Sequence, residues 1–231
     1  MKTIGLIGGM SWESSLEYYR IINTTVKEQL GSSHSAKSIM FSYDFKEIEL
    51  LQNQGNWEEL AASMIQIAKK LEKFGAELII ICTNTMHIVA DDMQRNLSIP
   101  IIHIADATAE KIQEKDLHEV GLLGTKFTME ESFYKDRLRQ KYGLNVSIPK
   151  EEERQVIHDV IYNELVIGQI KEKSRIKYIE IINQLVVKGA EGIILGCTEI
   201  PLLIKQEDVD IPLFDTTTIH AKSAVKYALN H

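Results

Sequence analysis

The chain has 231 residues, of which 44% are hydrophobic and 26% are charged, and its 33 acidic and 26 basic side chains give a net charge of −7. This composition excludes wholesale disorder, and the length suits one large domain or two smaller ones. An acidic chain without a basic stripe argues against nucleic-acid binding. No apolar run approaches the roughly 20 residues of a membrane span, and the first expected strand begins at Thr3, so we expect neither a membrane partner nor a signal peptide. Two cysteines are too few for a disulfide framework, which favours a reduced, cytoplasmic protein.

Short β-branched segments alternate with longer amphipathic segments, which is typical of βαβ units around parallel sheets. In chain order, the expected strands are residues 3–7, 37–43, 77–82, 99–103, 119–123, 144–148, 192–195 and 211–214. The expected helices are residues 12–30, 56–74, 129–142, 174–188 and 216–230, and an acidic run at 151–153 suits the first turn of another helix. The sequence therefore predicts an α/β protein.

The chain repeats itself. Four motifs of the first half return in the same order in the second: residues 4–8 and 120–124, 75–77 and 189–191, 98–100 and 210–212, and 106–108 and 215–217. Chance could produce any one of these pairs, but four in order predict two similarly folded halves with about four strands each.

Small polar residues follow two matching strands, as Cys82-Thr83-Asn84-Thr85 and as Gly196-Cys197-Thr198-Glu199. Ligands of open parallel sheets bind beyond the carboxyl ends of the strands. A lone strand-end cysteine is usually a small buried hydrophobe, but here both cysteines of the chain lie at matching points of a repeat. Aligning the two Gly-Ala-Glu triplets places Thr83 opposite Cys197 and Cys82 opposite Gly196. Cys197 is the first candidate for chemistry, and Thr83 ranks ahead of Cys82.

Three motifs in this order resemble the aspartate/glutamate racemase superfamily: residues 8–11 (Gly-Gly-Met-Ser), 84–85 (Asn-Thr) and 196–199 (Gly-Cys-Thr-Glu). The resemblance covers essentially the whole chain and is closest to the broad-specificity bacterial branch. It implies two pseudo-symmetric α/β halves with the active site in the cleft between them. The first half would be residues 1–103 joined by a C-terminal helix at 214–231, and the second would be residues 104–213. It also implies an amino-acid substrate, racemisation without pyridoxal phosphate, no metal, and a homodimer.

The family mechanism needs two acid/base groups on opposite faces of the substrate's α-carbon. The resemblance assigns these roles to Cys197 and Thr83. Family members typically carry a cysteine in each half, and in this sequence Thr83 takes the place of the cysteine of the first half. A thiol, with its usual pKa of about 8.5, becomes a usable base once a helix N-terminus lowers that value. A threonine hydroxyl is a much weaker acid and needs help from a neighbour such as His87. We therefore expect Cys197 to handle one enantiomer well and the Thr83 side to be slower.

Substrate binding is the second task. The turn with Met10 and Ser11 offers backbone N–H groups and a helix start to an α-carboxylate, and the resemblance adds four polar side chains and Glu199. These four are Gln52, Asn84, Thr85 and Thr198. The basic residues that grip the side-chain carboxylate in archaeal-type aspartate racemases align with Glu49 and Val166, so Lys126 is the best available cation. The histidines show no metal-ligand spacing.

Three other functions are open to this sequence. A hydantoin racemase or maleate-type isomerase would belong to the same superfamily. A non-catalytic amino-acid-binding or regulatory protein would explain why threonine replaces a base. A Rossmann oxidoreductase is disfavoured because the G-x-G-x-x-G fingerprint is absent.

Overall fold

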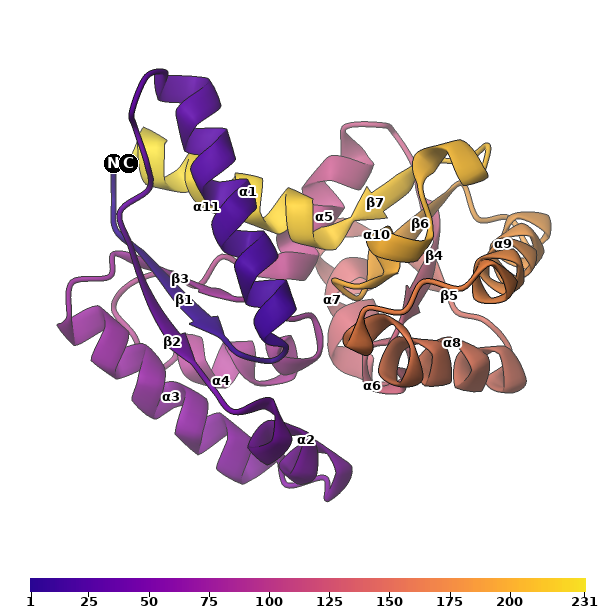
Figure 1. Cartoon of the computed structure of the whole chain (residues 1–231), viewed down its shortest axis with the longest axis horizontal. Helices are drawn as coiled ribbons and strands as arrows, with labels where there is room; N and C mark the ends of the chain where they lie inside the picture. The colour runs from indigo at the N-terminus through magenta and orange to yellow at the C-terminus, as the bar shows by residue number, and fades with distance from the viewer. The chain divides into compact units, whose positions relative to one another are not determined.

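The computed structural model describes residues 1–231 and contains two compact units (Figure 1). The first unit comprises Met1–Ile104 and His220–His231, and the second comprises Ala105–Ile219. The last helix, α11 (Thr216–Asn230), is shared between the units instead of belonging wholly to the first. Its first turn stays with the second unit because the Thr216 hydroxyl donates a hydrogen bond to the carbonyl of Leu195 at 2.8 Å. None of the helices combines the length and the apolar character that a membrane crossing requires.

The first unit is built on a three-stranded parallel sheet of order β2-β1-β3, in which β1 (Ile4–Gly8) is central. The remaining elements are β2 (Ser38–Ser42), β3 (Leu78–Ile81), α1 (Trp12–Leu30), α2 (Phe45–Asn53), α3 (Trp57–Lys73), the 3-10 helix η1 (Thr85–Val89) and α4 (Ala90–Gln94). The expected strand at 99–103 is only a single bridge between Ile79 and Ile101. Pro100 has no N–H to donate, and the chain turns into helix α5 at Ile104, so the pairing cannot lengthen.

The second unit has a four-stranded parallel sheet of order β5-β4-β6-β7. Its strands are β4 (Glu119–Gly124), β5 (Asn145–Ser147), β6 (Gly192–Gly196) and β7 (Leu213–Asp215). Its helices are α5 (Ile104–Gln113), α6 (Lys126–Glu130), α7 (Ser132–Tyr142), α8 (Glu151–Asn163), α9 (Glu172–Val187) and α10 (Ile200–Leu203), with 3-10 turns η2 (Leu165–Ile167) and η3 (Gln206–Asp208). The expected helix at 129–142 is in fact two helices, because Glu131 between α6 and α7 is extended.

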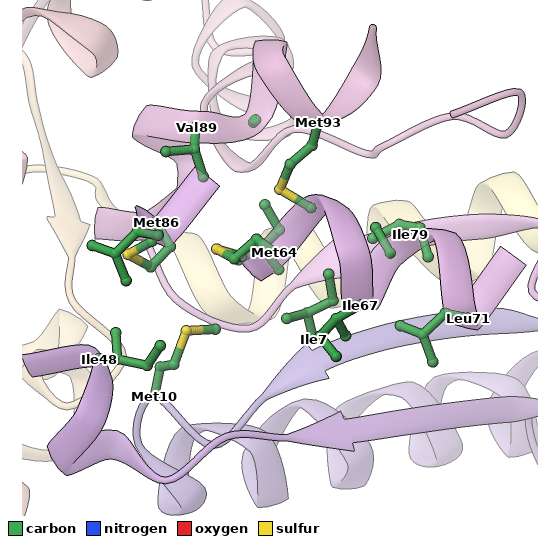
Figure 2. Close-up of a cluster of buried hydrophobic side chains, with 14 of the residues drawn as sticks. Ile7, Met10, Ile48, Met64, Ile67, Leu71, Ile79, Met86, Val89 and Met93 are labelled. Atoms are coloured by element: carbon green, nitrogen blue, oxygen red, sulfur yellow. The ribbon is translucent and has the colours of Figure 1, made fainter. Parts of the chain in front are cut away.

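Two hydrophobic clusters cover the two faces of the first unit's sheet. Side chains of successive strand residues point to opposite faces, so Ile79 and Ile81 join a methionine-rich cluster under α3, which contains Met10, Met64, Met86 and Met93 (Figure 2). Leu78, Ile80 and Cys82 join the other cluster, beneath α1 and α11. A strand buried on both faces explains the continuous apolar run of β3.

The sequence repeat is also a repeat of contacts. Gly5 on β1 lies opposite Ile79, and Gly121 on β4 lies opposite Ile193. A Cβ atom would lie 2.6 Å from the Ile79 Cδ1 in the first case and 2.5 Å from the Ile193 Cδ1 in the second. Both central strands therefore require glycine for the same reason, close contact with an isoleucine of the neighbouring strand.

The glutamates of the two Gly-Ala-Glu triplets repeat a second contact. The Glu77 carboxylate accepts a hydrogen bond from the N–H of Thr3 at 2.8 Å. The Glu191 carboxylate accepts one from the N–H of Glu119 at 3.0 Å. Each glutamate thus satisfies a main-chain donor at the beginning of the central strand of its own unit.

Candidate active site

Cys197 directly follows β6, and its thiol and the Thr198 hydroxyl bind the same carboxylate oxygen of Glu199. Its Sγ–H donates to Oε2 of Glu199 at 3.0 Å, and the Thr198 hydroxyl donates to the same Oε2 at 2.7 Å. Glu199 is 7% exposed and is the last residue before α10. A buried thiol is therefore in direct contact with a buried proton acceptor.

Burial raises the pKa of the Cys197 thiol well above its usual value, and the negative charge of Glu199 raises it further. Hydrogen bonds from the main-chain N–H groups of Glu199 and Thr198 act in the opposite direction but are outweighed. The expectation that a helix start lowers this pKa is therefore wrong, because burial and the negative charge of Glu199 outweigh the main-chain N–H groups that precede α10. The resting thiol is protonated, and Glu199 is the group placed to accept its proton.

Strand register relates Cys197 to Thr83. In the first unit Ile7 pairs with Ile81, and in the second Leu123 pairs with Leu195. Thr83 lies two residues after Ile81 of β3, and Cys197 lies two residues after Leu195 of β6. The strand register therefore makes Thr83 and Cys197 equivalent, as the sequence repeat does.

Cys82 lies in the hydrophobic core. Its side chain is fully buried in the cluster beneath α1 and α11, and this burial strongly raises the pKa of its thiol. Thr83 is half-buried. Of these two neighbours, only Thr83 is exposed enough to meet a substrate.

His87 contacts the main chain of Thr83. Its Nδ1 lies 2.8 Å from the Thr83 carbonyl oxygen, and its Nε2 accepts a hydrogen bond from the N–H of Ile104 at 3.2 Å. Both ring nitrogens therefore have main-chain partners. The expectation that His87 assists the Thr83 hydroxyl is replaced by a hydrogen bond to the carbonyl of the same residue.

The turn after β1 is held firmly at the start of α1. Ser11 is the N-cap, and its Oγ accepts from the N–H of Ser14 at 3.3 Å, while the Ser15 hydroxyl accepts from the N–H of Gly9 at 2.8 Å. The Met10 side chain is 5% exposed and packs in the methionine-rich cluster near Ile48 (Figure 2). The Met10 side chain is therefore part of the hydrophobic core.

The other candidates of the first unit lie near the ends of its elements. Gln52, at the end of α2, is buried and donates from Nε2 to the Met86 sulfur at 3.2 Å. Asn84 and Thr85 are 3% and 6% exposed at the start of η1. These three side chains, like Ser11 and Thr83, belong to the first unit, whereas Cys197, Thr198, Glu199 and Lys126 belong to the second.

Lys126 is the first residue of α6, and its main-chain N–H donates to Nδ1 of His158 on α8 at 3.3 Å. The Lys126 side chain is half-buried and forms no ion pair within the second unit. Glu49, by contrast, pairs with Lys46 at 2.7 Å, and Val166 is a half-buried residue of η2. Sequence reasoning missed His158, whose position thirty-two residues after Lys126 carries no local signal.

Sequence reasoning also missed a cluster of three histidines in the first unit. His87 lies with its ring centroid 4.7 Å from that of His103 and 5.4 Å from that of His220, and all three are buried. His87 follows Thr83 by one helical turn, which was the one available signal. His220 is distant in sequence and reaches the site on α11.

Comparisons with known proteins agree with one another. The model of the Asp/Glu/Hydantoin racemase family matches residues 7–224. A broad-specificity amino-acid racemase of Bacillus subtilis is 25% identical over 96% of both chains. Among solved structures, a protein proposed to be an Asp/Glu racemase from Yersinia pestis is 50% identical with a TM-score of 0.95, and an aspartate racemase homologue from Pyrococcus horikoshii is 40% identical with a TM-score of 0.87. Both alignments cover 100% of each chain.

Proposed function

Because the chain belongs to the Asp/Glu/hydantoin racemase family, and is therefore a racemase, we propose that it interconverts the enantiomers of aspartate, glutamate or both by cofactor-independent proton transfer. The observation that carries this proposal is the hydrogen bond between the Cys197 thiol and the Glu199 carboxylate. This buried pair supplies the base, as the Cys197 thiolate, and the carboxylate that accepts the thiol proton.

The proposed reaction has three proton transfers. Glu199 accepts the Cys197 proton, and the resulting thiolate removes the α-proton of one enantiomer, leaving the electron pair of the broken C–H bond delocalised into the substrate carboxyl group. A proton delivered to the opposite face of the α-carbon then forms the new C–H bond. In this proposal the Thr83 hydroxyl, which occupies the equivalent strand end of the first unit, gives that proton and takes it in the reverse direction. The Thr83 alkoxide then regains a proton from water as Glu199 releases the proton that it accepted, which restores both groups.

The acidic substrate is proposed from the polar groups around these strand ends. The N–H groups of the turn that ends at Ser11, together with Asn84 and Thr85, suit an α-carboxylate. Lys126 suits the side-chain carboxylate of aspartate or glutamate, because it is a half-buried cation with no ion-pair partner in its own unit. The Thr198 hydroxyl donates to Glu199, and in this proposal its oxygen accepts a hydrogen bond from the substrate ammonium.

Deuterium exchange at the α-carbon in heavy water tests the proposal. The wild-type protein is given each enantiomer of aspartate and glutamate, and both deuterium incorporation and inversion are followed. We expect Cys197→Ala to abolish inversion and Thr83→Ala to slow it, while Cys82→Ala retains it. Hydantoins and neutral amino acids are the comparison substrates.

Two results would contradict the proposal. If none of the four acidic substrates exchanges its α-proton, the protein binds amino acids without acting on them. Loss of inversion with Cys82→Ala, together with full activity of Thr83→Ala, would transfer the second acid/base role to Cys82.

A further inference from the structure

Three imidazoles lie together in the core of the first unit. The side chains of His87, His103 and His220 are 2%, 7% and 0% exposed, and they come from η1, from the residue preceding Ile104, and from α11. We refer to these three residues as the histidine cluster. Its members are brought together only by the fold, since they lie at widely separated positions of the chain.

The partners of His87 define its protonation. The main-chain N–H of Ile104 can only donate, so Nε2 of His87 must carry the lone pair that accepts it. Nδ1 then bears the proton and donates to the carbonyl oxygen of Thr83, which can only accept. The neutral Nδ1–H tautomer satisfies both contacts at once.

His220 is held in the complementary way. Its Nε2 lies 2.7 Å from the carbonyl oxygen of Ile102, which requires a proton on that nitrogen, and its Nδ1 is 2.8 Å from the Tyr18 hydroxyl. The cluster thereby joins the segment at residues 102–104, α1 and α11. The ring of His87 rests against a fixed neighbour.

Two consecutive carbonyl groups at the end of β3 have side-chain partners. The Ser14 hydroxyl donates to the carbonyl of Cys82 at 2.8 Å, and His87 binds the carbonyl of Thr83 at 2.8 Å. The main chain that carries the Thr83 side chain is therefore fixed from α1 and from η1. Proton transfer is sensitive to displacements of the reacting groups by about 1 Å.

We propose that His87 is a positioning residue for proton transfer at Thr83, acting through its Nδ1–H bond to the Thr83 carbonyl and not by contact with the substrate. This inference rests on the proposed function, because it assumes that Thr83 exchanges a proton with the substrate. It assigns the histidine cluster the task of keeping His87 in place.

Two substitutions of His87 separate its two hydrogen bonds. Asparagine places an amide group close to the position of Nδ1 and can still donate to Thr83, whereas glutamine reaches the position of Nε2 and can replace only the contact with Ile104. Tyr18→Phe is the control, since it removes a hydrogen bond at the far side of the cluster without touching Thr83. Thr83→Ala identifies the enantiomer whose α-proton removal depends on Thr83.

We expect His87→Gln to reduce this Thr83-dependent exchange by roughly tenfold or more, with exchange of the opposite enantiomer unchanged. His87→Asn is expected to keep the Thr83-dependent rate within about threefold of the wild type, and Tyr18→Phe to leave the ratio of the two rates unchanged. Equal losses for both enantiomers, or equal effects of glutamine and asparagine, would overturn the inference. If the wild type itself exchanges neither enantiomer, the proposed function fails first and the inference fails with it.

Nitrogen-15 NMR of the wild-type protein provides a second measurement that does not depend on a variant folding. The imidazole of His87 is expected to carry its proton on Nδ1 at neutral pH. A proton on Nε2 would break the hydrogen bond to Thr83 and overturn the inference.

Discussion

Gln94 and Gln206 make the same pair of main-chain hydrogen bonds in the two units. Gln94 donates to the carbonyl of Ile99 at 3.1 Å and accepts from the N–H of Ile101 at 2.7 Å. Gln206 donates to the carbonyl of Ile211 at 2.9 Å and accepts from the N–H of Leu213 at 3.0 Å. Each glutamine thus binds the residue before and the residue after a proline, Pro100 in the first unit and Pro212 in the second. These bonds hold the chain at a position where proline has no N–H to donate.

Replacing either glutamine by alanine removes this pair of hydrogen bonds, and for Gln206 also a longer one to the carbonyl of Val209 at 3.3 Å. Because both side chains are exposed and water can take their place, we expect each substitution to lower the free energy of unfolding by about 1–2 kcal/mol. Urea denaturation measures this loss. Gln155→Ala is the control, since the Gln155 side chain bonds only to Asp159 on its own helix. A loss no larger than that of the control would refute the role of these hydrogen bonds.

Met64 tests the packing of the methionine-rich cluster (Figure 2). Its side chain is fully buried, so Met64→Ala is expected to cost about 2–5 kcal/mol through lost contacts and a residual cavity. Met64→Leu nearly conserves the volume and is expected to cost less than about 1.5 kcal/mol. Thermal and urea unfolding compare the two variants. Similar losses for leucine and alanine would mean that shape, and not volume, governs this site.

Glu199→Gln separates the two effects of Glu199 on Cys197. Removing the negative charge lowers the pKa of the thiol, so its alkylation by a small reagent should reach half its maximal rate at a lower pH than in the wild type. Racemisation should nevertheless fall by about 10²-fold or more, because the acceptor for the thiol proton is lost. Cys82→Ala serves as the background for both proteins, so that only Cys197 reacts. If the pH dependence of the alkylation rate is the same in Glu199→Gln as in the wild type, Glu199 does not affect the pKa of the thiol.

Burial lowers the pKa of His220 from 6.5 to about 4, which makes the protein sensitive to acid. The unfolded chain takes up this proton near pH 6.5, whereas the folded chain does so only near pH 4. The contribution of neutral His220 is therefore complete above pH 6.5 and is lost as the pH falls towards 4, at up to about 1.4 kcal/mol per pH unit and on the order of 3 kcal/mol in total. Urea denaturation between pH 7.5 and 4.5 measures it. His220→Gln should give a flatter dependence, and an identical slope would exclude His220 as the source.

Lys126→Met tests the proposed grip on the side-chain carboxylate. Loss of a charge-assisted hydrogen bond is expected to raise KM for aspartate and glutamate by about 10- to 100-fold with little change for a neutral amino acid. Lys126→Arg keeps the charge and should retain part of the affinity, and Lys173→Met is a surface control. Equal KM changes for acidic and neutral substrates would assign the substrate contact to another residue.

Local signals predicted much of the fold. Ser11 and Gly31 delimited α1 to the residue, because a side-chain cap and a positive-φ glycine are short-range features. The repeat also ranked Thr83 above Cys82, since alignment of the two halves carries the strand register with it. The full burial of Cys82 supports the same ranking, and it could not be read from the sequence.

Features that depend on distant contacts could not be predicted. The pKa of Cys197 depends on its burial and on the way the Glu199 side chain turns back towards it, and the sequence indicated neither. The histidine cluster needs α11 to return to the first unit and place His220 beside His87. In both cases the chemistry lies in side-chain placement that no spacing rule encodes.

The division of α11 between the two units bears on the order in which a newly made chain can fold. Ala221, Ala224, Val225 and Ala228 complete the core beneath α1, and the carbonyl of Ala228 accepts a hydrogen bond from the N–H of Lys2 at 2.8 Å. During synthesis, residues 105–219 are all present before these four alanine and valine side chains have left the ribosome. The sequence of the first unit is consequently the last to be complete, and that unit closes by joining Lys2, near its start, to α11.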